Sequence, residues 1–195
     1  MQTALGPIMR DYLIRFQQTA IKETGRRPLT WLRTPMDEKL VLAGCQRPGY
    51  AFWQPIPWKD GNVPLGNDAA KFHPSIVDYL SMCQFLEIRF HLPVASSGSP
   101  LSFLYKRTFE TYKNTESAPP ERAFQEALIY GREHPELPLC FNMASSCDGG
   151  DPLLLMLRAE DGQAFVLYAD RPCEPLYLKV SIDRLLPKLQ FVYEF

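Results

Sequence analysis

The sequence predicts an α+β domain in which helices pack on a mostly antiparallel, twisted sheet. Three observations predict it: a helical repeat of apolar residues near the N-terminus, short apolar runs separated by turn residues, and the order in which the two patterns alternate. With 195 residues, of which 46% are hydrophobic and 22% charged, the chain has an ordinary globular composition. This length favours a single domain over residues 1–195.

The first expected elements are a helix and a hairpin. Apolar residues recur every three or four positions over 3–24, with charged residues between them, which predicts an amphipathic helix that ends at Gly25. Two apolar runs follow, 40–43 and 50–53, and the turn signal Pro48-Gly49 lies between them. These runs predict two paired strands.

The middle of the chain continues with a loop, a helix and two strands. Residues 59–67 have the composition of a loop. Pro74 suits the first turn of a helix, and apolar residues then repeat at helical spacing to about residue 84. The alternating runs 86–94 and 101–105 predict two strands joined by a loop rich in serine and glycine.

The last third of the chain predicts a helix, four strands and a closing helix. The helix covers 119–133, and Glu121 lies in its first turn, where the helix dipole favours an acidic residue. The closing helix covers 181–189 with Ser181 as its N-cap, and an apolar tail follows over 190–195. The four expected strands are 139–144, 153–158, 164–169 and 175–180.

Charge and hydropathy limit the possible partners. The 21 basic residues nearly balance the 22 acidic ones, so no global field attracts nucleic acid or an anionic membrane. The apolar runs are too short to cross a bilayer, and charges interrupt the N-terminus where a signal peptide needs an apolar core. We therefore expect a cytoplasmic protein without an integral membrane segment.

The sequence carries no strong signal for an enzyme. We find no P-loop, dinucleotide-binding, zinc-protease or nucleophile-elbow motif, and expect no cofactor. The scattered cysteines and histidines lack metal-ligand spacing, and the cysteines are odd in number, which argues against a disulfide framework. A cysteine and a histidine that meet only in the fold remain the enzymatic alternative. The residues concerned are Cys45, Cys83, Cys140, Cys147, Cys173, His73, His91 and His134.

The aromatic stretch YAFWQPIPW, residues 50–58, is the first candidate for partner binding. If Phe52 and one of Tyr50 or Trp53 face the core, alternation leaves the remaining aromatic residue on the other side of the sheet, and the prolines at 55 and 57 give the stretch a rigid exit. Exposed tryptophan and tyrosine side chains are frequent in protein-binding hot spots, so Tyr50, Trp53 and Trp58 are candidate anchors. The alternative is that both tryptophans close the ends of the hydrophobic core.

Acidic residues in the loops of the last strands are the second candidate. Asp148 and Asp151 flank two glycines in SSCDGGD, a segment that reads as a hairpin turn, and Glu160 and Asp161 lie in the next turn. We expect these four residues to form a negative rim that serves recognition.

The same order of motifs resembles the Syd family. FWQPIPW at 52–58, after a helix and a strand, is similar to the W-Q-P segment of that family, and HPSIVDYLSMCQF, LSFLYKR, ERAFQEALIYGRE and SIDRLLPKL resemble elements that follow it. Syd belongs to the SUKH superfamily, whose α+β domains bind other proteins without catalysis. The resemblance covers nearly the whole chain and implies a SUKH/Syd-like fold.

The resemblance implies two protein partners. Many SUKH proteins are immunity proteins that block a bacterial toxin, while Syd binds the cytosolic loops of the SecY translocon at the inner membrane. This chain differs from Syd because IYGREHPEL lacks the Gly-His-Leu motif and because its charge is nearly neutral. We therefore expect an immunity protein that occludes the active site of a cognate toxin, with SecY binding as the alternative.

Overall fold

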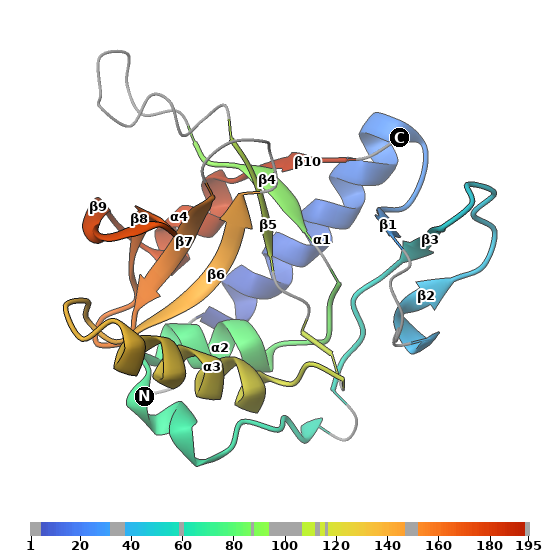
Figure 1. Cartoon of the computed structure of the whole chain (residues 1–195). Helices are drawn as coiled ribbons and strands as arrows, with labels where there is room; N and C mark the ends of the chain where they lie inside the picture. Colours follow the sequence, from blue (N-terminus) through green and yellow to red (C-terminus); the bar gives the residue numbers. More distant parts are fainter. Residues whose placement is uncertain are drawn as a thin grey trace.

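The structure, a computed structural model, describes residues 5–31, 38–58, 61–86, 88–93, 107–111, 114–115, 117–146 and 152–193. In these residues four α-helices accompany a three-stranded sheet and an open seven-stranded sheet (Figure 1). All pairs of neighbouring strands in both sheets are antiparallel. The predicted α+β class with a mostly antiparallel sheet is confirmed.

All four expected helices are present. They are α1 (Leu5–Thr24), α2 (Pro74–Ser81), α3 (Pro120–Glu133) and α4 (Ile182–Leu185). The second ends before the predicted residue 84 because Gln84 pairs with Ile56 in an isolated bridge. The fourth passes into a 3-10 turn over Leu186–Lys188, and the Ser181 side chain makes no capping hydrogen bond. No helix in the described part of the chain is long and apolar enough to cross a membrane.

The small sheet contains the predicted hairpin. Its strands are β1 (Leu29–Trp31), β2 (Val41–Leu42) and β3 (Tyr50–Trp53), and β3 lies in the middle. Strand β3 ends where predicted, before Pro55, which has no N–H to donate. Strand β1 was not predicted, because three residues are too few to establish an alternating pattern.

The large sheet confirms the four strands expected in the last third of the chain and adds others. The expected run 86–94 gives only a three-residue strand, and 101–105 lies outside the described residues. The tail pairs with β4 as an edge strand. In spatial order the strands are β10 (Gln190–Val192), β4 (Arg89–His91), β5 (Thr108–Thr111), β6 (Cys140–Ser146), β7 (Leu153–Arg158), β8 (Gln163–Tyr168) and β9 (Arg171–Ser181).

One face of the large sheet, which we call the first face, lies in the main core. Leu153, Leu155 and Leu157 point to this face because alternate residues of a strand share a side, and all three are fully buried. They belong to one hydrophobic cluster with residues of α1, α2 and α4. The small sheet joins the same cluster through Trp53, whose ring lies 5.7 Å from that of Phe16 on α1.

The turn between β7 and β8 is fitted closely against the start of α2. Gly162 has a φ of 68°, and a Cβ atom added to it would lie 2.5 Å from the Ser75 hydroxyl oxygen. That oxygen is 2.7 Å from Nδ1 of His73, the N-cap of α2, so it has little freedom to move. The turn therefore needs glycine for both its backbone conformation and its packing.

Replacement of Gly162 by alanine tests this contact. We expect Gly162→Ala to lower the free energy of unfolding by about 3 kcal/mol, through left-handed strain and overpacking. The control is Gly61→Ala, since Gly61 has the same φ of 68° but open space around it. We expect this variant to lower the free energy of unfolding by only about 1 kcal/mol. Chemical denaturation measures both, and equal losses would contradict the close fit.

Candidate functional site

The opposite face of the large sheet, which we call the second face, is mixed in character. Strand register places two rows of side chains across this face. The first row begins with polar residues on β4, β5 and β6, and the second row ends with aromatic residues on β8 and β9. Helix α3 packs on this face over β6 (Figure 1). The rows are Arg89, Glu110, Ser145, Leu154 and Leu167, and then Asn142, Met156, Phe165 and Tyr177.

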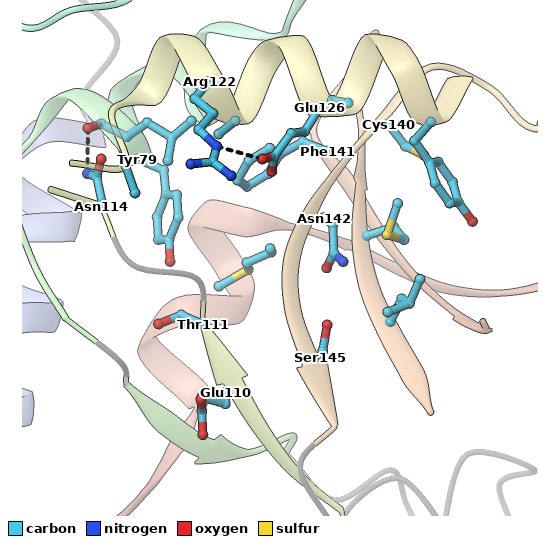
Figure 2. A pocket seen from close by; sticks show the side chains of 18 of the residues that line it. Tyr79, Glu110, Thr111, Asn114, Arg122, Glu126, Cys140, Phe141, Asn142 and Ser145 are labelled. Carbon is cyan, nitrogen blue, oxygen red and sulfur yellow. Dashed lines mark hydrogen bonds and ion pairs between the residues drawn. The ribbon is translucent and has the colours of Figure 1, made fainter. Parts of the chain in front are cut away.

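A cleft of about 640 Å³ opens between α3 and the second face (Figure 2). It arises because the pairing of β5 with β6 ends at Thr111, which lies opposite Ala144. The chain beyond β5 instead pairs through Asn114 with Phe85, which follows α2. The space left between the diverging strands lies beneath α3, and its volume is typical of a site for a small molecule or a partner side chain.

The inner wall of the cleft is largely apolar. Helix α3 contributes small residues that leave room, while the sheet and the end of α2 contribute aromatic rings and methionines. Methionine side chains are flexible and adapt to different contacts. The apolar wall includes Phe85, Ala123, Ala127, Phe141, Met143 and Met156.

The charged residues of the wall are paired. Arg122 and Glu126, one turn apart on α3, approach to 2.8 Å at the exposed edge (Figure 2). Glu110 at the other edge is 2.8 Å from Arg89, which faces it across the strand pair. In the described wall, acidic and basic charges are thus matched, and the cleft offers a charged ligand no unpaired counter-ion.

Two buried polar residues in the wall have unused hydrogen-bonding capacity. Tyr79 and Asn114 are each only 2% exposed. The Asn114 amide donates to the carbonyls of Leu80 and Cys83, both at 2.8 Å, but its oxygen has no partner in the described part of the chain. The Tyr79 hydroxyl has none there either. Because an unsatisfied buried polar group costs free energy, each needs a physical explanation.

The cleft also contains a cysteine, but not one suited to nucleophilic chemistry. Burial raises the pKa of the Cys140 thiol to about 12, and that of Cys83 to the same value. Both thiols are therefore protonated at neutral pH, whereas the thiolate is the reactive form. These environments do not favour the enzymatic alternative for these two cysteines.

The three histidines lie on different elements. His73 caps α2, His91 lies in β4, and His134 follows α3. The described residues contain no group of three or more histidine, cysteine or acidic side chains that would hold a metal ion.

The predicted tryptophan anchors are core residues. Trp53 is fully buried and Trp58 is 6% exposed, so the alternative in which both belong to the core is the one observed. Strand β3 turns Ala51 and Trp53 inward and leaves Phe52 on the outer side, which corrects the expected alternation. Tyr50 is half-buried, and the Arg47 guanidinium lies 3.9 Å from its ring centre. Partner binding through Tyr50 stays a prediction.

Only half of the predicted acidic rim lies in the described part of the chain. Asp148 and Asp151 lie outside the described residues. Glu160 and Asp161 lie in the turn between β7 and β8. Asp161 also accepts hydrogen bonds from the Arg158 side chain and, at 3.1 Å, from the Gln163 N–H. It stabilises the turn.

The fold and the cleft define an α+β protein with a partly apolar cleft between a helix and a sheet. No family model matches the chain, and no curated protein matches it. The resemblance to the Syd family therefore stays a prediction.

Sequence reasoning missed the cleft. Its wall combines residues from the end of α2, the end of β5, β6, β7 and α3, which come together only in the fold. One signal was present, because Asn142 interrupts the apolar run of β6 with a polar side chain. An amide inside a buried strand often indicates a polar site.

Removal of the Tyr79 hydroxyl tests whether it is unsatisfied. We expect Tyr79→Phe to raise the free energy of unfolding by about 1 kcal/mol, because the ring stays and an unpaired buried hydroxyl is lost. The matched control is Tyr193→Phe, since the Tyr193 hydroxyl donates to the Phe16 carbonyl at 2.9 Å. We expect the control to lower the free energy of unfolding by about 1 kcal/mol. A loss in both variants on denaturation would contradict the assignment.

The pH dependence of stability tests the role of Asp161. Hydrogen bonding by Arg158 holds the pKa of Asp161 below its ordinary value of 3.8. A lowered pKa means that the carboxylate stabilises the fold at neutral pH and that this contribution is lost as the pH falls below about 4. We expect Asp161→Asn to be less stable at neutral pH and to approach the wild type in acid. A difference independent of pH would contradict this role.

Proposed function

We propose that the protein is a non-enzymatic, cytoplasmic module that binds another protein, and that it is an immunity protein which neutralises a cognate bacterial toxin by covering the toxin's active site. The observation that carries this proposal is the second face, which α3 covers over β6 while Tyr177 at its far side stays 45% exposed. The Tyr177 ring packs on that of Phe165, with centroids 5.6 Å apart. A tyrosine held rigidly by a neighbouring ring suits an interface anchor.

The distribution of side chains on the second face supports protein binding. Half-buried Leu154 lies beside the cleft, and the paired Arg89 and Glu110 lie toward the other edge of the sheet. An apolar centre with a polar border is the usual anatomy of a protein interface. A surface of this kind inhibits by occupying space, for which no catalytic residue is needed.

Binding to SecY is the second candidate, and it rests on the resemblance to Syd alone. Basic loops of the translocon would require an acidic surface. The charged pairs on the second face are instead balanced, and the formal net charge of the chain is −1. This charge balance favours a toxin over SecY as the partner. SecY binding would place the protein peripherally at the inner membrane.

Capture of the tagged protein from its native cells, followed by mass spectrometry, tests the proposal. We expect a toxin encoded beside it to remain bound at moderate salt, and Tyr177→Ala to weaken that binding at least about tenfold. The matched control is Ile21→Ala, because Ile21 is 46% exposed and lies on α1, which packs against the first face. Tyr50→Ala tests the anchor expected from the sequence.

Each outcome discriminates between the candidates. A purified toxin that loses activity at a one-to-one ratio would support occlusion. Recovery of SecY without a toxin, with binding that falls steeply as salt is raised, would support the translocon instead. A toxin complex that is insensitive to Tyr177→Ala would overturn the placement of the interface on the second face.

A further inference from the structure

We propose that the cleft beneath α3 is a binding site for an uncharged, flat, largely apolar ligand that carries an amide group. This inference concerns a small-molecule site and does not depend on the protein partner proposed above. It rests on the size of the cleft, the balance of its charges and the unpartnered polar atoms of the two most deeply buried polar side chains of its wall, the Tyr79 hydroxyl and the Asn114 amide oxygen.

The shape of the wall favours a flat apolar group. The Tyr79 ring lies edge-to-face with Phe85, at 5.7 Å, and with Phe141, at 6.5 Å. Such rings accept a further ring in offset or edge-on contact. Met143 and Met156 line the same space and can adjust to the bound surface. An aromatic ring is thus a better fit than a sugar or a phosphate.

The charges of the wall favour a neutral ligand. Arg122 and Glu126 satisfy each other at one edge, and Arg89 satisfies Glu110 at the other. A carboxylate or ammonium group in the cleft would lose its hydration and find no unpaired opposite charge among the described residues of the wall. Binding of a charged analogue should therefore be much weaker than that of its neutral counterpart.

The unpartnered atoms favour an amide. Burial raises the pKa of Tyr79, so its hydroxyl keeps its proton and has a hydrogen bond to donate. Two backbone carbonyls orient the Asn114 side-chain amide by accepting hydrogen bonds from its NH₂ group. Its oxygen therefore stays available to accept a hydrogen bond from a ligand. An amide is a neutral group that offers both a carbonyl acceptor and an N–H donor. Figure 2 shows Tyr79 and Asn114 on the same side of the space beneath α3.

Titration with three small probes tests the proposal on the 195-residue chain. The probes are benzamide, benzoate and toluene, which share a ring but differ in charge and in the amide. Backbone NMR spectra report where each probe binds. We expect benzamide to shift signals of α3, the end of β5 and β6, and benzoate to bind at least about tenfold more weakly.

A conservative variant identifies the hydrogen bond. We expect Tyr79→Phe to weaken benzamide binding about tenfold and to leave toluene binding unchanged, because only benzamide uses the hydroxyl. Tyr193→Phe, whose hydroxyl bonds Phe16 away from the cleft, should leave benzamide binding as in the wild type. The folded state of each variant is checked in the same spectra.

Three results would overturn the inference. Benzamide shifts that are absent or spread over the surface would exclude a built site. Equal binding of benzamide and toluene would show an apolar cavity without amide recognition. Unchanged benzamide binding in Tyr79→Phe would show that the Tyr79 hydroxyl does not contact the ligand. None of these results bears on capture of a toxin, so the protein-binding proposal is tested separately.

Discussion

Burial of the first face of the seven-stranded sheet is the constraint on which the rest of the structure depends. Leu153, Leu155 and Leu157 on β7 meet the helices α1, α2 and α4 in one core. Register is fixed by this burial, because a slip of one residue would turn every buried side chain to the opposite face. The β7–β8 turn is then held against α2, where Gly162 meets Ser75. The position of α2 therefore depends on the register of strands that are distant in sequence.

The same register decides what the second face can offer. Since alternate residues point away from the core, the second face is free to vary in character without loss of the core. Here it changes from the ion pair of Arg89 and Glu110, through Leu154, to the aromatic pair of Phe165 and Tyr177. Among the described residues, helix α3 covers this face over β6, while Tyr177 at the far side stays 45% exposed. The proposed small-molecule site and the proposed protein interface are neighbours on one surface.

The sequence predicted the elements better than their contacts. Helices and the longer strands were found because their apolar periods extend over many residues, as in α1 and β7. Strands β1 and β10 are three residues long and carry no such period. The burial of the two tryptophans was missed for another reason: composition does not reveal which side of a strand is covered, and Phe16 of α1 packs on Trp53. Of the four acidic residues, Glu160 and Asp161 lie in the described part of the chain, and Asp161 is held by Arg158 within its own turn.

The cleft follows from two local departures from regular pairing. Strand β6 shifts register against β7 between Asn142 and Ala144, which places the extra residue Met143 at the cleft. Bulges of this kind bend a strand and are frequent beside functional sites. On its other side β6 has no β5 partner before Ala144, because the chain beyond Thr111 pairs through Asn114 with Phe85 instead. A strand that is bulged on one side and unpaired on the other cannot close the sheet beneath α3. The buried, unsatisfied Tyr79 and Asn114 lie at that opening, where a regular sheet would have had no place for them.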